Sequence, residues 1–196
     1  MKDFIIGVDS GGTTTIAKAY DLKGQLITST QTGFGNLLVN ETKALDHLKQ
    51  AVNTLLDQLD TTYCKGIVFG IAGIDTGGYK QLVYDAFKDL NLNIVIMNDA
   101  WLAHYALLAG EDGCLLISGT GSVALGRYHG KEDRVGGWGH LLGDAGSGYA
   151  IAKHLIQDVL AAYDAGREWS PLENQLFLQG VFTNPFEMAR FVYQSS

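Results

Sequence analysis

The order of apolar segments limits the possible folds of this chain more than any other feature of its sequence. Apolar, strand-like segments at residues 66–72 and 93–97 alternate with helical patterns at 79–90 and 99–109. Strands that are separated by helices pair in parallel, and the helices then cover the faces of the sheet. This order predicts an α/β fold.

The first third of the chain adds strands of the opposite orientation. Strand-like segments cover residues 4–9, 14–21 and 26–32, with a short turn between the last two. Leucine and valine then recur every three or four residues from Asn40 to Leu59, which predicts an amphipathic helix capped by Asn40. An antiparallel start followed by strand–helix units predicts a mixed sheet flanked by helices.

A unit of strand, Gly/Thr turn and strand occurs twice in the chain. The first turn is Asp9-Ser10-Gly11-Gly12-Thr13 and the second is Ser118-Gly119-Thr120-Gly121-Ser122, each between two apolar segments. The recurrence predicts two related domains, 1–110 and 111–196. Two unrelated hairpins would give the same spacing, so duplication is one of two open explanations.

The C-terminal part of the chain predicts helices. A glycine-rich stretch covers residues 136–148, and a helix is expected from its end to about residue 165. Two further helices are expected over 171–179 and 185–194, the last one capped by Asn184 with a proline in its first position. The second domain has only two or three predicted strands, too few for a sheet that matches the first.

Composition and charge exclude several classes of protein. Eleven of the 25 glycines lie between Gly113 and Gly148 and only two prolines are present, which argues against a disordered or collagen-like chain. The net charge of −7 argues against non-specific binding to nucleic acids or anionic membranes. No apolar stretch reaches the ~20 residues of a membrane-spanning helix. We expect no signal peptide and a cytoplasmic location.

The cysteines and histidines do not predict a metal site. Cys64 and Cys114 stand singly in apolar strand-like segments, which predicts buried free thiols. The histidines show neither an HExxH pattern nor zinc spacing with the cysteines. His47, His104 and His154 lie within predicted helices, where we expect them at or near the surface.

Both Gly/Thr turns have the chemistry of a phosphate site. Glycine lets the backbone approach an anion closely, and consecutive N–H groups and threonine hydroxyls donate to phosphate oxygens. A strand follows each turn, whereas a Rossmann or Walker A loop leads into a helix, so those two motifs are excluded. The alternative is a pair of ordinary glycine-containing hairpins.

Two carboxylates stand where a ligand is expected. Asp99 follows the segment 93–97, and α/β sheets bind ligands at the carboxyl ends of their strands, where it would act as a general base toward a hydroxyl. Asp144 lies within the glycine-rich stretch and would face a ligand. The alternative for each is capping of the following helix. Trp138, in the same stretch, would pack either on a sugar or in the core.

These motifs, taken in order, resemble a known family. The residues concerned are Gly7-Val8-Asp9-Ser10-Gly11-Gly12-Thr13, Leu116-Ile117-Ser118-Gly119-Thr120-Gly121-Ser122, and Gly136-Gly137-Trp138-Gly139-His140 with Gly143-Asp144 and Gly146-Ser147. They are similar to the N-acetylglucosamine kinase group of the BadF/BadG/BcrA/BcrD ATPase family, in the superfamily of sugar kinases and actin. The resemblance implies a ribonuclease H-like, actin-type ATPase fold. It also implies that the second lobe is incomplete in this chain and that the adenosine-binding segment lies outside it.

The resemblance further implies an activity and a role for each matched residue. The activity would be ATP-dependent phosphorylation of the 6-hydroxyl of an amino sugar, N-acetylglucosamine before others, with ATP and Mg²⁺. Asp99 would be catalytic and Asp9 would hold Mg²⁺ through water. The residues that would bind the ATP phosphates are Gly11, Gly12, Thr13, Gly119, Thr120, Gly121 and Ser122. Those that would contact the sugar are Asn36, Gly137, Asp144 and Gly148.

Two alternatives to the kinase stay open. One is an ATPase that activates a partner enzyme, as in other branches of the family, but their paired cluster cysteines are absent here. The other is a sugar-binding piece without catalysis. Ala72 stands where relatives often carry serine, which leaves the choice among N-acetylglucosamine, glucosamine and N-acetylmuramic acid open. The expected partners are the sugar and ATP, without nucleic acid or membrane, and a homodimer is compatible with this interpretation.

Overall fold

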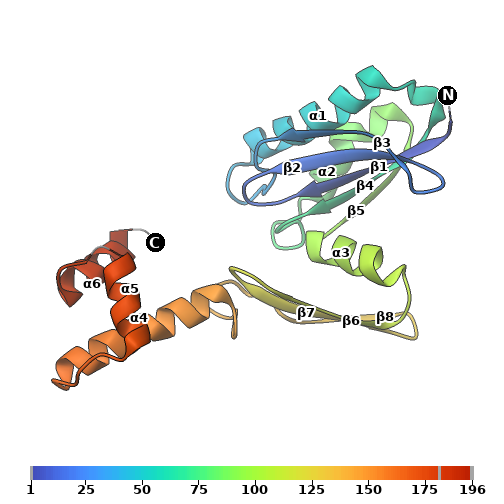
Figure 1. Ribbon diagram of the computed structural model, residues 1–196. Coiled ribbons are helices and arrows are strands. Elements are labelled where there is room, and N and C mark those ends of the chain that lie inside the picture. The colour runs from blue at the N-terminus through green and yellow to red at the C-terminus, as the bar shows by residue number, and fades with distance from the viewer. Residues whose placement is uncertain (1, 181, 195–196) are drawn as a thin grey trace. The chain divides into compact units, whose positions relative to one another are not determined.

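The computed structural model describes residues 2–180 and 182–194 (Figure 1). Its contacts divide the chain into two compact units. Unit 1 runs to Cys114 and includes Arg127–Lys131, and unit 2 comprises Leu115–Gly126 and the chain from Glu132 onward. The domain boundary expected at residue 110 stays a prediction.

Unit 1 contains a mixed β-sheet, as the order of segments predicted. Its strands are β1 (Phe4–Ser10), β2 (Thr15–Asp21), β3 (Leu26–Thr32), β4 (Cys64–Ile71) and β5 (Asn93–Met97). Their order in the sheet is β3-β2-β1-β4-β5. β2 runs antiparallel to β1 and β3, whereas β4 runs parallel to β1 and β5. The carboxyl ends of β1, β4 and β5 therefore meet at one edge.

The helix α1 (Glu41–Gln58) is stabilised by an N-terminal cap and by a buried apolar stripe, as the sequence predicted. The Asn40 side chain caps it by accepting a hydrogen bond from the Lys43 N–H at 3.0 Å. Its leucine and valine stripe is buried, with Leu48, Val52 and Leu55 fully covered. α2 (Lys80–Phe87) follows β4, and short 3-10 turns cover Thr61–Tyr63 and Lys88–Leu90.

An apolar core holds the sheet of unit 1 to its helices. Phe69 of β4 packs on Phe87 of α2 with ring centroids 4.9 Å apart. Full burial of each large apolar side chain contributes roughly 1.5–3 kcal/mol relative to exposure. The largest fully buried apolar side chains of this core are Phe4, Phe69, Ile6, Leu48, Leu55, Ile67, Ile71, Ile74 and Val8.

The helix α3 (Asp99–Leu108) begins directly after β5. It lies close to β4 because Gly70 has no side chain, and a Cβ there would stand 2.5 Å from Leu102 Cδ2. His104 of α3 is fully buried, so its expected surface position is wrong. Its Nε2 lies 3.1 Å from the Gly113 carbonyl oxygen, and this hydrogen bond lets a polar ring enter the interior.

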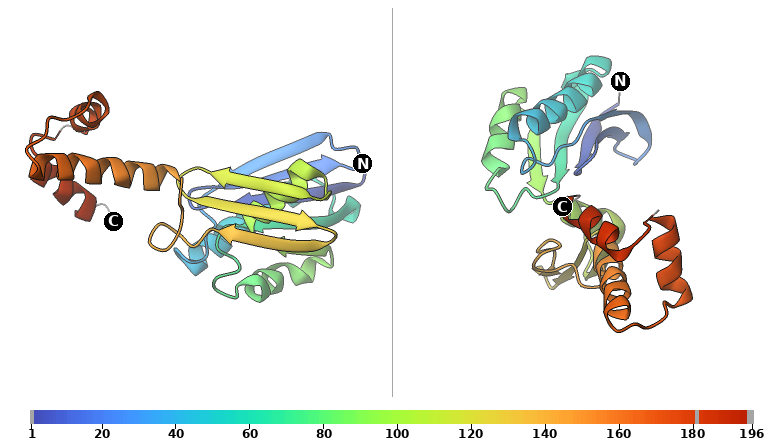
Figure 2. Two further views of the ribbon diagram at one scale, coloured as in Figure 1. Left: turned by 90° about the horizontal axis from the view of Figure 1, so that it is seen from below. Right: turned by 90° about the vertical axis from the view of Figure 1, so that its left-hand side faces the viewer.

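Unit 2 contains most of a second sheet and a set of helices (Figure 2). The strands β6 (Gly113–Ser118), β7 (Ser122–Tyr128) and β8 (Lys131–Gly136) pair in the order β6-β7-β8, and the sequence had not located β8. The helices are α4 (Gly148–Asp164), α5 (Pro171–Gln179) and α6 (Pro185–Gln194), with the bounds of the last two as predicted. The Asn184 side chain accepts from the Glu187 N–H at 3.0 Å, as the predicted cap requires.

Unit 2 buries few apolar side chains. In its described residues they are Leu125, Val159, Ala162, Pro185 and Met188. Its buried polar side chains are Asp144, Ser147 and Glu173. Hydrogen bonds and ion pairs consequently have a larger part in holding this unit than they have in unit 1.

The two cysteines differ in exposure although both are free thiols, as predicted. Cys64 is buried at the start of β4, where burial raises the pKa of its thiol. Cys114 is exposed, because the side chains of β6 alternate between exposed and half-buried positions. The prediction that this thiol is buried is therefore wrong. No helix in the described part of the chain has the length and apolar character needed to cross a membrane.

Candidate active site

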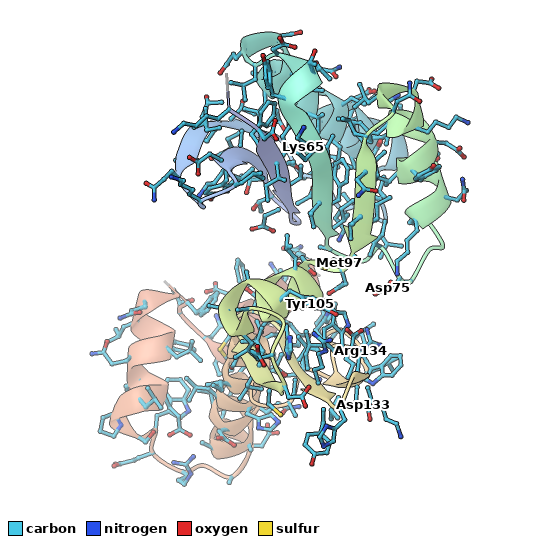
Figure 3. All side chains as sticks on the ribbon, turned by 90° about the vertical axis from the view of Figure 1, so that its right-hand side faces the viewer. Lys65, Asp75, Met97, Tyr105, Asp133 and Arg134 are labelled. Atoms are coloured by element: carbon cyan, nitrogen blue, oxygen red, sulfur yellow. The ribbon has the colours of Figure 1, made fainter. Side chains whose placement is uncertain are left out.

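Two carboxylates follow the parallel strands of unit 1 at the same edge of the sheet. In the strand register Asp9 pairs with Gly70, and Gly70 pairs with Met97, two residues before Asp99. β1 and β5 are two strand spacings apart, or about 10 Å. Figure 3 labels Met97 and Asp75 at this end of the sheet. The sheet thus presents acidic groups on both sides of the end of β4.

The environment of Asp99 favours its protonated form more than water would. The residue is half-buried, and burial raises the pKa of its carboxyl group above the usual range. The negative charges of Asp9 and Asp75 raise this pKa further, while a hydrogen bond from the Ala100 N–H at 2.9 Å opposes the shift. Such a shift at the end of a sheet is typical of an acid–base group.

The capping interpretation of Asp99 is wrong. The N-cap of α3 is Asn98, whose side chain accepts from the Ala100 N–H at 3.0 Å. Asp99 is instead the first residue inside the helix. The extended backbone of Asn98 places the cap one residue before the position that the sequence suggested.

The first Gly/Thr turn is held by the interior of unit 1. The Gly11 N–H donates to the Thr14 carbonyl at 2.9 Å and closes the hairpin between β1 and β2. Below the turn, the buried hydroxyls of Ser10 and Thr15 share a hydrogen bond of 2.7 Å. A Cβ on Gly12 would have no atom within 4 Å, so that side of the turn is open.

Gly35 supports this turn from the side, and the sequence interpretation had not singled it out. Its N–H donates to the Gly11 carbonyl at 3.0 Å. A Cβ on Gly35 would stand 1.6 Å from Ser10 Oγ and 2.6 Å from Thr15 Oγ1, so no side chain fits there. Thr15 carried the available signal, because it is a polar residue on the strand face that it shares with the buried Ala17.

Asn36 follows Gly35 in the segment that joins β3 to α1. The half-buried Asn36 accepts a hydrogen bond from the Leu38 N–H at 3.0 Å through Oδ1. The same oxygen lies 3.2 Å from the position of a Cβ on Gly73, just beyond β4. Unit 1 therefore brings the predicted sugar residue Asn36 to the end of the strand that separates Asp9 from Asp99.

The second Gly/Thr turn connects β6 to β7 and lies against the end of the glycine-rich stretch. The Ser118 hydroxyl donates to the Gly146 carbonyl at 3.1 Å, and the Ser122 hydroxyl donates to the Ala145 carbonyl at 2.9 Å. The Gly148 N–H donates to the Gly119 carbonyl at 2.8 Å. Unit 2 thus brings these parts of the sequence together.

Asp144 holds this turn instead of capping α4. Its Oδ1 accepts from the Ser122 N–H at 3.0 Å, and only 8% of the residue is exposed. The cap of α4 is Ser147, whose hydroxyl accepts from the Ala150 N–H at 3.1 Å. The alternative that Asp144 caps the next helix is therefore wrong.

The start of the glycine-rich stretch lies against β7. The Gly137 N–H donates to the Ser122 carbonyl at 3.0 Å, and the positive φ of 71° at Gly137 is a conformation that favours glycine. Trp138 is 65% exposed, so its packing in the core is excluded. The guanidinium of Arg134 lies over its ring, 4.7 Å from the centroid.

The carboxylates at the edge of the unit 1 sheet can hold Mg²⁺ only together with water and a phosphate-bearing ligand. In the described residues no group of three or more histidine, cysteine, aspartate or glutamate side chains forms a metal cage. Mg²⁺ commonly takes one or two carboxylates and completes its shell with water and substrate phosphates. The exposed carboxylate of Asp9 at the end of β1 fits that mode.

Comparisons with known proteins agree with these motifs. The chain is 29% identical to an N-acetylmuramic acid/N-acetylglucosamine kinase of Clostridium acetobutylicum, over 98% of this chain and 65% of the relative. It is 34% identical to an N-acetyl-D-glucosamine kinase of Dictyostelium discoideum, over 83% of this chain and 56% of the relative. The chain thus spans less than two thirds of the length of these relatives.

Solved structures show the same fold. A candidate N-acetylglucosamine kinase from Chromobacterium violaceum superposes with a TM-score of 0.71 at 22% identity, over 90% of this chain and 63% of that one. A glucokinase of the ROK family from Streptomyces griseus, in complex with glucose and AMPPNP, gives a TM-score of 0.53 at 20% identity, over 82% and 62%. The fold is therefore that of the actin-like sugar kinases. The profile of the BadF/BadG/BcrA/BcrD ATPase family matches residues 6–191, and the chain belongs to this family.

Proposed function

We propose that this chain carries the catalytic and sugar-binding residues of an ATP-dependent amino-sugar kinase. The observation that carries the proposal is the half-buried carboxyl group of Asp99, with its raised pKa, at the end of β5. It lies at the same sheet edge as Asp9 and Asn36. The relatives named above are kinases of N-acetylmuramic acid and N-acetylglucosamine, which supports the same reaction class.

In this proposal Asp99 is the general base for the 6-hydroxyl of the sugar. The hydroxyl oxygen forms a bond to the γ-phosphorus of ATP while the bond from that phosphorus to the leaving ADP oxygen breaks. The hydroxyl proton passes to the Asp99 carboxylate. A pKa above the usual carboxyl range strengthens the base, and catalysis of this kind contributes roughly 10²–10⁴ in rate.

The phosphate charge is met by backbone donors in this proposal. Gly11, Gly12 and Thr13 form one set of ligands in unit 1, and Gly119, Thr120, Gly121 and Ser122 form the other in unit 2. Mg²⁺, when bound, would neutralise phosphate charge, and Asp9 would hold it through water. Positioning and charge neutralisation of this kind are the main requirements of phosphoryl transfer.

The proposed sugar contact of unit 1 is Asn36. The proposed sugar contacts of unit 2, taken by themselves, are Gly137, Asp144 and Gly148. N-acetylglucosamine is the proposed substrate, since both relatives above are named for it. A glucosamine kinase of Vibrio cholerae, 29% identical over 87% of this chain and 59% of the relative, makes glucosamine the first comparison sugar. Ala72, which directly follows β4, provides no hydroxyl for a further sugar contact.

A binding and transfer experiment tests the proposal. Calorimetry measures the affinity of the chain for N-acetylglucosamine and for Mg²⁺ with ATP, and phosphoryl transfer is followed by formation of ADP. Asp99→Ala is expected to reduce transfer by roughly 10²–10⁴ and to leave the sugar affinity nearly unchanged. The matched control is Asp57→Ala, which removes an exposed carboxylate from α1.

Full transfer activity in Asp99→Ala would overturn the role of this residue. Sugar binding without any nucleotide binding would favour a non-catalytic sugar-binding protein. Nucleotide binding and hydrolysis without any sugar affinity would favour an ATPase that acts on a partner enzyme.

A further inference from the structure

The second Gly/Thr turn owes its conformation to residues that follow it by more than twenty positions. Hydrogen bonds join the turn to the segment 144–149 through the hydroxyls of Ser118 and Ser122 and through backbone groups. The Gly148 N–H donates to the Gly119 carbonyl at 2.8 Å, and the Tyr149 N–H donates to the Thr120 carbonyl at 3.2 Å. The turn is therefore hydrogen-bonded to the first residues of α4.

These two backbone hydrogen bonds orient the N–H groups of the turn. In a trans peptide the carbonyl and the following N–H point in opposite directions, and the described residues contain no cis peptide. Because the carbonyls of Gly119 and Thr120 point toward α4, the N–H groups of Thr120 and Gly121 point away from it. Neither N–H has a hydrogen-bond partner among the described residues. The result is a pair of adjacent donors that face the same side, the arrangement that binds anions.

Asp144 fixes the end of the turn at which these donors lie. Its Oδ1 accepts from the Ser122 N–H at 3.0 Å, the amide that follows Gly121. Its other oxygen lies against Gly121, where a Cβ would stand 2.9 Å from Oδ2. A buried carboxylate is costly unless hydrogen bonds compensate it, so the turn and the carboxylate stabilise each other.

We propose that Asp144 is a positioning residue for nucleotide phosphate. It holds Ser122 and Gly121 so that the N–H groups of Thr120 and Gly121 stay directed at a phosphate oxygen. The inference rests on the proposed function, because that function supplies the nucleotide. It goes beyond that function, which gives Asp144 only a contact with the sugar. A group that acts through the turn changes nucleotide affinity, whereas a sugar contact changes sugar affinity.

Two variants disrupt the contact between the Asp144 carboxylate and the second turn, one by changing Asp144 and the other by changing Gly121. Asp144→Gly removes the carboxylate, and glycine accepts the positive φ of 61° at this position without strain. Gly121→Ala retains the Asp144 carboxylate, but the added methyl group pushes it away from the turn. Asp144→Asn keeps an acceptor oxygen for the Ser122 N–H and provides a conservative rescue. Asp133→Asn, at an exposed position on β8, is the matched control.

The first measurement is hydrogen exchange of the amides in residues 118–122, without any ligand. Loss of a hydrogen bond to a charged acceptor is expected to speed exchange of the Ser122 amide by about tenfold or more in Asp144→Gly and in Gly121→Ala. The second measurement is calorimetry with Mg²⁺ and a non-hydrolysable ATP analogue. The Kd of the analogue is expected to rise about tenfold in both variants and to recover largely in Asp144→Asn.

The two measurements separate this proposal from the proposed function. An unchanged nucleotide Kd in both variants, with a raised Kd for N-acetylglucosamine in Asp144→Gly, would overturn the positioning role. Unchanged exchange in both variants would overturn the support of the turn by Asp144. Failure of the unaltered chain to bind the analogue would overturn the nucleotide role of this turn within the chain, while exchange would still decide whether Asp144 holds the turn and transfer activity would still test the proposed function. If Asp144→Gly does not fold, the nucleotide Kd and the amide exchange of Gly121→Ala test the proposal instead.

Discussion

The two Gly/Thr turns have similar sequences, but different forces support them. The turn at residues 11–14 lies over the buried hydroxyls of Ser10 and Thr15 and against Gly35, at the edge of an extensive apolar core. The turn at residues 118–122 is held by the carboxylate of Asp144 and by the first residues of α4. Similar local sequence therefore does not imply similar energetics.

The difference has practical consequences for the two units. Around the first turn the buried polar groups are neutral, and close packing fixes their positions. Unit 2 buries the carboxyl groups of Asp144 and Glu173 and few apolar side chains in its described residues. Unit 1 should therefore respond most to changes of volume, and unit 2 to changes of charge and pH.

The largest expected effect comes from adding one methyl group in unit 1. Gly35→Ala would place its Cβ 1.6 Å from Ser10 Oγ, so the first turn or the β1–β2 hairpin must shift. We expect the free energy of unfolding of unit 1 to fall by about 3 kcal/mol or more. The rate at which a thiol reagent labels the buried Cys64, in a Cys114→Ser background, reports opening of this unit in urea.

Gly12→Ala is the matched control for this prediction. A Cβ on Gly12 meets no atom within 4 Å, so the expected change in unfolding free energy is below about 0.5 kcal/mol. Equal labelling rates of Cys64 in the two variants would show that packing against Gly35 does not support the first turn.

A smaller effect is expected from charge removal in unit 2. Glu173 caps α5 together with Ser170 and pairs with Arg167, with 2.7 Å between Arg167 Nη2 and Glu173 Oε1. The Arg167 guanidinium, with hydrogen bonds from Ser170, lowers the pKa of Glu173 from 4.5 to about 2. A lowered carboxyl pKa gives stability that is complete above pH 4.5 and is lost as the pH falls toward 2.

Glu173→Gln should remove this acid dependence and lower the stability of unit 2 at neutral pH. Fluorescence of Trp169, which packs on Phe177 at 4.6 Å between ring centroids, reports on α5 when the other tryptophans are replaced by phenylalanine. Glu168→Gln, at an exposed neighbouring position, is the control. If Glu173→Gln lost structure in acid to the same extent as the unaltered chain, the ionised Glu173 carboxylate would not be what stabilises unit 2.

The smallest expected effect concerns Asp99, the carboxyl group of unit 1 with a raised pKa. Because burial raises this pKa, the folded chain binds the proton more tightly than the unfolded chain does. Stability from this group is therefore present in acid and is lost as the pH rises through the folded pKa, the opposite sign to Glu173.

Asp99→Asn should consequently become more stable relative to the unaltered chain as the pH rises from 3.8 toward neutrality. Urea unfolding of both proteins across this range, followed through Cys64 labelling, measures the difference. Asp57→Asn on α1 serves as control. A difference that stays constant with pH would mean that the site around Asp99 does not destabilise its charged form.

The features that the sequence predicted are those that local rules determine. The bounds of β3 and β5, the Asn40 cap and the helices α5 and α6 follow from side-chain periodicity and from caps within a few residues. The motif order was also sufficient to identify the family, because ordered glycine motifs combine along the chain.

The features that were wrong or missed depend on distant partners. Asp144 binds Ser122, 22 residues earlier, and no local pattern connects the two. His104 is buried, and its Nε2 lies within hydrogen-bond distance of the Gly113 carbonyl, a contact that helix periodicity does not reveal. The exposure of Cys114 follows from how β6 is covered, and that is a property of tertiary packing. The roles of individual site residues stay predictions.

The position of the unit 1 core along the chain affects the order of folding. Its buried residues all lie between Phe4 and Phe87, and the half-buried residues packed on them extend only to Ile96. During synthesis the N-terminal part of a chain folds first. The complete core, and with it the support of the first turn, is therefore available to the nascent chain before the glycine-rich stretch has been translated. The carboxylate-dependent turn of unit 2 then forms only after the sheet of unit 1 has folded.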